Sequence, residues 1–207
     1  MSVMSRISRQ QIYDEIKHDI ITCALAPGEP LSDNQFVDRF QVSKTPIREA
    51  LTSLVQDGLL EYIPNRGFMV TGISIKDIQE IFEARQVCES ALFRLALKYV
   101  TDADVDRLEK LSQTNTETVE AFLKANFEFH MALAALSRNS RLVRYYENLL
   151  GESQRLFFMD FSRHETLSQW GHGHGMILSA LRNRDEQAGL AAIEETLESA
   201  RKRTLGL

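Results

Sequence analysis

The sequence predicts a mainly α-helical protein with two parts. The first is a winged helix-turn-helix of three helices and a β-hairpin wing, and the second is an all-α bundle of about six helices. Short helical and strand-like runs, separated by Pro and Gly turns, fill the first part. Strand signals stop after residue 72, and proline is absent from residue 65 to the end. We therefore predict domains at residues 1–73 and 74–207, with a short junction between them.

The first helix of the N-terminal part is predicted by isoleucines spaced four residues apart. Ile12, Ile16 and Ile20 fall on one face of a helix. The segment APGEP at residues 26–30 ends that helix, because Pro-Gly forms a turn. Ser32 followed by Gln35 has the pattern of a capping box and begins a second, short helix.

The third helix is predicted in VSKTPIREALTSLVQDGLL, residues 42–60. Ser43 is a suitable N-cap, Pro46 falls in the first turn where a missing N–H costs little, and Gly58 ends the helix. Two strand-like runs then flank the turn PNRG, so Leu59–Thr71 is predicted to be a β-hairpin.

The C-terminal part shows one helical segment after another, which together can bury a core of their own. Ser74 with Asp77 and Thr101 with Asp104 mark two capped helix starts. The predicted helices are Ile75–Tyr99, Asp102–Thr116, Thr118–Leu136, Ser140–Phe161, Leu167–Arg182 and Asp185–Arg203.

Composition narrows the class of protein. A hydrophobic content of 43% and a charged content of 26% are ordinary for a soluble globular chain. The net charge of -5 excludes a broadly basic coat, although a small DNA-reading surface can lie on an acidic protein. Cys23 and Cys88 match no disulfide or zinc spacing, and we expect both to be buried in a reducing cytosol. With no signal-peptide core and no apolar run of ~18–20 residues, we expect a cytoplasmic protein without membrane attachment.

The strongest functional signal is the third helix followed by a wing. The N-terminal end of such a recognition helix enters the major groove of DNA, where Arg and Lys donate to guanine and hydroxyl groups reach phosphates. Taken singly, Lys44 or Arg48 is better explained as an ordinary solvated residue at a helix start. It is the complete series of helix, turn, helix and wing that favours DNA. The candidate DNA-binding residues are Ser43, Lys44, Thr45 and Arg48 on the helix and Asn65, Arg66 and Gly67 on the hairpin.

The run GHGHGMILSAL, residues 171–181, admits a metal loop, a phosphate-binding glycine loop or the start of a core helix. A nucleotide loop is excluded because no strand precedes the glycines. In a regular helix His172 and His174 would point ~200° apart and could not share one ion.

Residues 25–70 resemble the DNA-binding domain of the GntR family of bacterial transcription regulators. The segment runs from LAPGEPLSDNQF through VSKTPIREAL to PNRGFMV. The family usually has Arg at the position of Lys44; the charge is kept, but the planar fork with which Arg binds bidentately is absent. The later segments IFEARQVCESALFRLA, NFEFHMALAALSRNSRL and HGMILSALRNRDEQAGLAAIEETL are similar to the all-helical FCD effector domain of the FadR-type branch. The resemblance covers nearly the whole chain.

The resemblance implies a divalent metal such as Zn or Ni. In that branch the ligands are an Asp or Asn, a His four residues later and one His on each of two later helices. These positions carry Asn126, His130, His174 and Thr196 here, so the set has no carboxylate and lacks its last ligand. His172 would fill the gap only if its segment is not helical. The alternative for His130 is a core histidine satisfied by hydrogen bonds.

The same residues indicate a polar cavity within an apolar bundle. We expect Arg85, Asn126, His130 and His174 to line it, because buried polar groups need partners and a small anionic effector supplies them. The guanidinium of Arg85 suits a carboxylate. Its alternative is an ion pair with Glu89, four residues along the helix.

These observations favour a ligand-responsive transcription regulator that acts as a homodimer on double-stranded operator DNA. The resemblance implies repression of a catabolic or metabolic operon, relieved by a small organic acid. Two alternatives are a metal-dependent enzyme using the His130/His174 pocket and a helical interaction module with a degenerate DNA-binding domain. No nucleophile or general-base constellation supports an enzyme, so we expect none.

Overall fold

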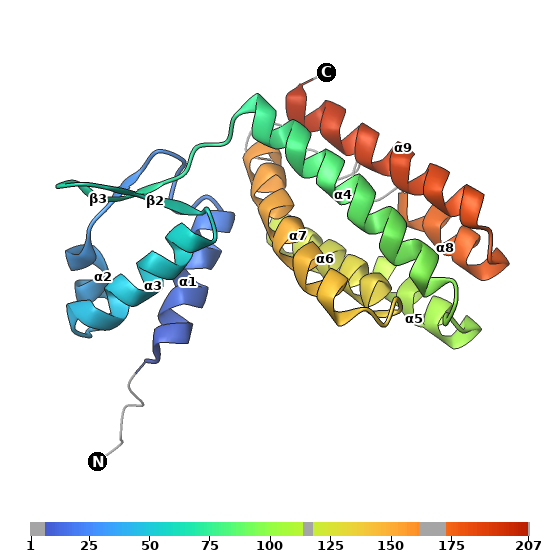
Figure 1. Ribbon diagram of the computed structural model, residues 1–207, viewed down its shortest axis with the longest axis horizontal. Coiled ribbons are helices and arrows are strands. Elements are labelled where there is room, and N and C mark those ends of the chain that lie inside the picture. Colours follow the sequence, from blue (N-terminus) through green and yellow to red (C-terminus); the bar gives the residue numbers. More distant parts are fainter. Residues whose placement is uncertain (1–6, 114–117, 162–172, 207) are drawn as a thin grey trace, which may run out of the picture. The chain divides into compact units, whose positions relative to one another are not determined.

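A computed structural model of the protein describes residues 7–113, 118–161 and 173–206. The chain divides into two compact units, with the boundary between Ile73 and Ser74 (Figure 1). The described part of the chain contains no helix that combines the length and apolar character needed to cross a membrane.

The N-terminal unit consists of three helices and a small antiparallel sheet. In chain order its elements are α1 (Arg9–Ile21), β1 (Pro30–Leu31), α2 (Asp33–Phe40), α3 (Lys44–Gln56), β2 (Leu60–Ile63) and β3 (Gly67–Val70). The strand order is β1-β3-β2, with β3 in the middle (Figure 1). This confirms the predicted winged helix-turn-helix.

The sheet has one strand more than the predicted hairpin. Pro30 pairs with Met69 and Leu31 with Phe68, so β1 lies along the free edge of β3. This strand has only two residues, which is too short to show the alternation of apolar and polar residues by which strands are predicted. For this reason the sequence did not indicate it.

The predicted apolar face of α1 forms the core of this unit. Ile12, Ile16 and Ile20 are fully buried, α1 packs on α3, and the three isoleucines share one core cluster with buried residues of α3 and the sheet. Ser32 and Gln35 form the expected capping box at the start of α2. Ser43 is the N-cap residue of α3, but its side chain makes no capping hydrogen bond.

The C-terminal unit is all-helical among its described residues. Its helices are α4 (Ile75–Ala96), α5 (Asp102–Ser112), α6 (Val119–Ala135), α7 (Ser140–Phe161), α8 (Gly173–Asn183) and α9 (Glu186–Leu205). The predicted capping boxes at Ser74 and Thr101 are both present. The helix predicted to run to Tyr99 ends at Ala96. The stretch 167–172 of another predicted helix lies outside the described residues.

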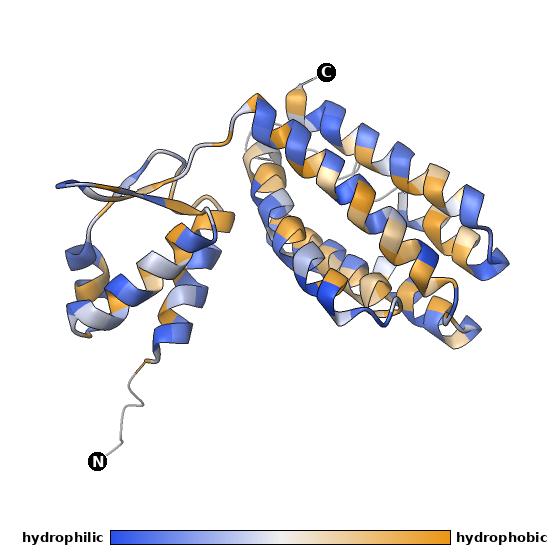
Figure 2. Ribbon diagram, viewed as in Figure 1, coloured by the Kyte–Doolittle hydropathy of each residue, from blue (hydrophilic) through white to orange (hydrophobic). Residues whose placement is uncertain are grey.

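Helix α4 lies between α7 and α9 and also packs on α6 (Figure 1). Leu92 of α4, Ala134 of α6 and Tyr146 and Leu150 of α7 form one buried cluster. Hydrophobic and hydrophilic positions alternate along these helices, as expected for amphipathic helices around a common core (Figure 2). Cys23 and Cys88 are half-buried, so the expectation of full burial is wrong.

Candidate functional site

An open groove in the N-terminal unit runs between α3 and the β2–β3 hairpin, and we call it the wing groove. Its volume is about 710 Å³. Five of the candidate DNA-binding residues line it: Lys44, Arg48, Asn65, Arg66 and Gly67. The groove is completed by Ser32, Asp33, Asn34, Thr52, Val55, Tyr62 and Phe68. Ser43 and Thr45 are exposed at the start of α3 but do not line it.

Three cations meet in the wing groove, and one of them is engaged by a carboxylate. The side chain of Arg48 is 69% exposed, and its Nε donates to Oδ2 of Asp33 at 2.5 Å. The hydrogen bond from Arg48 to Asp33 raises the pKa of the guanidinium. Lys44 and Arg66 form no ion pair with any described residue, so their charges are available to a duplex.

The turn at the tip of the wing explains its Asn and Gly. Asn65 has a φ of 64°, a left-handed conformation that asparagine tolerates. A Cβ on Gly67 would lie 2.9 Å from the carbonyl oxygen of Leu31, so β1 requires glycine there. Gly67 therefore shapes the turn, and Arg66 is the side chain that the turn presents.

The sequence did not single out Tyr62 or Asp33, although both line the groove. Tyr62 on β2 is 60% exposed and packs edge-on against Phe68 with ring centroids 5.4 Å apart. An exposed aromatic ring with a phenol beside two cations can contact a DNA backbone. The only sequence signal for Tyr62 is its place in a strand next to the PNRG turn.

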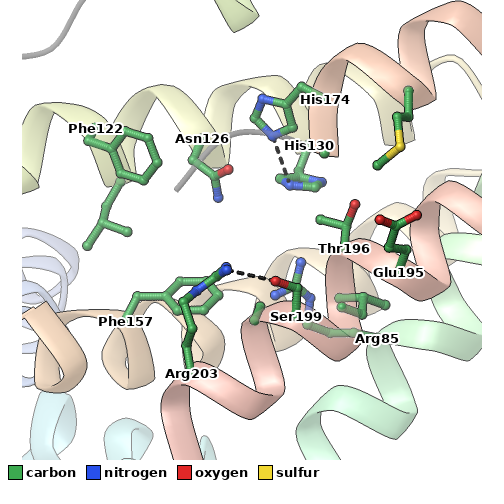
Figure 3. A pocket seen from close by; sticks show the side chains of 15 residues that line it. Arg85, Phe122, Asn126, His130, Phe157, His174, Glu195, Thr196, Ser199 and Arg203 are labelled. Carbon is green, nitrogen blue, oxygen red and sulfur yellow. Dashed lines mark hydrogen bonds between the residues drawn. The ribbon is translucent and has the colours of Figure 1, made fainter. Parts of the chain in front are cut away.

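A second site, the bundle cavity, lies inside the C-terminal unit (Figure 3). Its volume is about 120 Å³. It brings together Arg85 from α4, Asn126 and His130 from α6, and His174 from α8, the four residues that the sequence placed in one cavity. The other lining residues are Phe122, Leu123, Phe157, Gly173, Met176, Glu195, Thr196, Leu197, Ser199, Ala200 and Arg203.

The two histidines of the bundle cavity face each other. Nε2 of His130 and Nε2 of His174 are 3.4 Å apart, and Phe129 stacks on the His174 ring with centroids separated by 3.8 Å. The pKa of each imidazole is lowered to about 3, mainly because the ring is buried, and the positive charge of Arg85 contributes to the shift of His130. Both rings are therefore neutral near pH 7, so each has one nitrogen that donates and one that accepts.

Arg85 is held on one side and left unsatisfied on the other. Its Nε and Nη2 contact Oε1 of Glu89 at 2.9 and 2.8 Å, and the Tyr146 hydroxyl donates to the same oxygen at 3.0 Å. The ion pair that the i, i+4 spacing allowed is thus present. Burial favours a lower pKa for Arg85, but Glu89 and Tyr146 together outweigh it and the pKa is raised. Among the described residues, Nη1 of Arg85 has no hydrogen-bond partner although it is buried.

Thr196 occupies the fourth ligand position of the family but is unsuited to bind a metal. Its Oγ1 donates to the carbonyl of Ala192 at 2.7 Å. A Cβ added to Gly173 would come within 2.1 Å of this oxygen, so α8 and α9 are in close contact here. The threonine hydroxyl is therefore engaged within α9, and the side chain packs against Gly173 of α8.

The bundle cavity does not fit a resident divalent ion. The 3.4 Å between the two Nε2 atoms matches two ligands of a tetrahedral ion bound at ~2.0–2.1 Å. However, within the described ranges no third His, Cys, Asp or Glu joins the pair. Asn126 would add only a neutral oxygen, and the charge of Arg85 opposes a cation at His130. His172, the suggested replacement ligand, lies outside the described residues.

Two family models match the sequence. The model described as bacterial regulatory proteins, gntR family, matches residues 8–70, and the FCD domain model matches residues 80–199. The chain is 31% identical over 202 residues to the HTH-type transcriptional repressor RspR of Escherichia coli K12, covering 93% of this chain and 89% of RspR. It is 30% identical to the Nta operon transcriptional regulator of Aminobacter aminovorans, covering 78% of this chain and 79% of that one.

Solved structures share the fold. E. coli McbR/YncC superposes with a TM-score of 0.79 at 22% identity, covering 92% of this chain and 93% of McbR. A GntR transcriptional regulator from Rhodococcus sp. RHA1 gives a TM-score of 0.80 at 24% identity, covering 96% and 97% of the two chains. Helical and winged parts alike therefore have counterparts in proteins of known structure.

Proposed function

Since the chain belongs to the GntR family of bacterial regulatory proteins and contains an FCD domain, we propose that it represses a catabolic or metabolic operon and that a small anionic effector relieves the repression. The protein is a DNA-binding transcription regulator, and the metal-dependent enzyme considered from the sequence is set aside on the family match. We assign DNA binding to residues 1–73 and effector binding and dimerisation to residues 74–207.

The wing groove carries the proposal for DNA. Lys44 and Arg48 on α3, together with Arg66 on the wing, concentrate positive charge where a recognition helix and wing meet a duplex. In the proposed complex, Arg48 and Lys44 face base edges in the major groove. Ser43 and Thr45 bind phosphates, and Asn65 and Arg66 contact the adjacent backbone or minor groove.

The unsatisfied Nη1 of Arg85 carries the proposal for the effector. A buried donor without an acceptor costs free energy, and a carboxylate would remove that cost. Asn126 and the neutral histidine pair supply hydrogen bonds to a second polar group of the ligand. A cavity of about 120 Å³ is below the ~300–1,000 Å³ of sites for drug-sized molecules, so the effector is small. In this proposal the effector binds without a resident Zn or Ni ion.

Regulation requires that the effector bind one state of a dimer better than the other. We propose a homodimer with one winged unit per half-site of a pseudo-palindromic operator. The effector would change the relative placement of the two winged units, with a coupling free energy of ~1–3 kcal/mol, about 5- to 150-fold in operator affinity.

The Arg48→Ala variant tests the DNA assignment. Operator sites are first selected from random duplexes with the wild-type protein, and binding is then measured by gel shift. We expect Arg48→Ala to lose specific binding while size-exclusion chromatography shows an intact dimer. Lys17→Ala, which removes the same charge on α1 outside the groove, should bind normally. Unchanged affinity of Arg48→Ala would refute the assigned recognition helix.

The Asn126→Ala variant tests the effector assignment. A thermal-shift screen of small organic acids should find ligands that stabilise the wild type, by ~2.7 kcal/mol at a concentration of 100 times Kd. The same acid should release the wild-type protein from its operator. Asn126→Ala should lose both responses and keep operator binding. An acid that still stabilises Asn126→Ala to the same extent binds elsewhere.

A further inference from the structure

We propose that Asp33 is a positioning residue for DNA recognition, which holds Arg48 in the orientation that reads a guanine. The proposal rests on the DNA-binding function proposed above. Asp33 is the first residue of α2, directly after the Ser32 capping box, and its side chain is 13% exposed. It is therefore a fixed point at the edge of the wing groove. Arg48 comes from a different helix, and its long side chain is 69% exposed.

The contact between the two residues uses one face of the guanidinium only. Nε of Arg48 donates to Oδ2 of Asp33 at 2.5 Å. A guanidinium has five N–H donors, one on Nε and four on the two Nη atoms. Within the part of the chain that the structure describes, the Nη atoms of Arg48 make no hydrogen bond. The Nη edge, which donates bidentately to O6 and N7 of guanine, is thus free.

Fixing the guanidinium in advance favours a specific contact. A free arginine loses rotamer freedom when it binds a base, and a side chain already held by a carboxylate loses less. Without Asp33, Arg48 would be free to swing to any nearby phosphate, which carries no sequence information.

The charge of Asp33 has a separate effect, on overall affinity. A carboxylate beside the groove repels the phosphates of every duplex, so it lowers affinity for correct and incorrect sequences alike. The gain from an oriented Arg48 is made only where a guanine stands opposite it. The orientation of Arg48 therefore raises the ratio of specific to non-specific binding, while the charge of Asp33 lowers the overall affinity and leaves the ratio unchanged.

The test measures this ratio with the full-length protein. Fluorescence anisotropy gives Kd for the selected operator and for a scrambled duplex of the same length at one fixed salt concentration. The variants are Asp33→Ala, Asp33→Asn and Asp33→Glu. Asp38→Ala is the matched control, because Asp38 lies on the same helix, carries the same charge and does not line the groove.

We expect the operator-to-scrambled ratio of Asp33→Ala and Asp33→Asn to fall about 10- to 100-fold, the discrimination that one bidentate base contact supplies. Affinity for the scrambled duplex should stay the same or rise. Asp33→Glu should recover most of the ratio, and Asp38→Ala should keep it. In a scan of single base-pair changes, Asp33→Ala and Arg48→Ala should lose discrimination at the same base pair.

Three results would overturn the proposal. An unchanged ratio for Asp33→Ala means that the pair does not serve recognition. An equal rise in affinity for both duplexes means that Asp33 only screens a phosphate contact. A large loss of thermal stability with the ratio retained means that the pair is a tie between α2 and α3. If wild-type protein selects no operator at all, the failure lies instead with the proposed DNA-binding function.

Discussion

Replacing Glu89 by alanine should destabilise the C-terminal unit by about 3–5 kcal/mol, because it leaves Arg85 as an unpaired charge in the interior. The side chains of Arg85 and Glu89 are only 3% and 8% exposed, so water cannot replace the lost carboxylate. The Tyr146 hydroxyl loses its acceptor at the same time. For a unit of between ~100 and 150 residues, roughly 3 °C is lost per kcal/mol, so we expect Tm to fall by about 9–15 °C.

A double variant shows whether the loss of stability comes from burying an unpaired Arg85 charge or from losing the ion pair itself. Arg85→Met with Glu89→Leu removes both charges and keeps apolar volume, and such replacements of buried pairs are often neutral. The double variant should therefore be more stable than Glu89→Ala, with at least half of the lost Tm recovered. Thermal unfolding followed by circular dichroism measures all three proteins. A double variant as unstable as Glu89→Ala, or a fall below about 3 °C for Glu89→Ala alone, would refute the reasoning.

Three further results are expected. Histidines in the unfolded chain have a pKa near 6.5, whereas buried His130 and His174 have a pKa of about 3, so below pH 6.5 the unfolded chain binds more protons than the folded one. The free energy of unfolding should therefore fall by ~1.4 kcal/mol per pH unit per histidine as the pH is lowered below 6.5. A free energy of unfolding in urea that stays constant from pH 7 to pH 5 would contradict the burial of these histidines. Gly189→Ala would place a Cβ 2.0 Å from Phe93 and should cost ~1–3 kcal/mol in urea unfolding, whereas Gly151→Ala, with no atom within 4 Å, should gain up to ~1 kcal/mol. Adding Zn²⁺ or Ni²⁺ should leave Tm unchanged, and a rise that His130→Ala abolishes would show that a metal binds.

Local rules predicted much of the fold. Ser32, Ser74 and Thr101 each mark a helix start because a capping box is written within four residues of sequence. The ion pair of Arg85 and Glu89 follows from the i, i+4 spacing in the same way. Such features depend on neighbours along the chain, which the sequence displays directly.

Features that depend on distant residues were not predicted. The strand β1 exists only because Leu31 lies beside Phe68, far along the chain. Asp33 looked like an ordinary first-turn acid, and its contact with Arg48 depends on how α2 and α3 pack. Likewise, the sequence does not show that the hydroxyl of Thr196 donates to a carbonyl of its own helix. The close approach of Gly173 to this side chain, which leaves no room for a larger residue, depends on how α8 and α9 pack.

The small number of cations in the wing groove implies a weak salt dependence of operator binding, which matters when osmotic stress raises the salt concentration in the cell. The chain has a net charge of -5, and the groove itself offers a duplex only three cations, Lys44, Arg48 and Arg66. Even three neutralised phosphates would give a slope of only about -2.7 in a plot of log affinity against log salt, so a doubling of intracellular potassium weakens binding in each groove by no more than about six-fold. Regulators that contact many phosphates through lysines lose far more affinity for the same change in salt. Operator binding by this protein should therefore persist at intracellular salt concentrations at which such regulators dissociate from DNA.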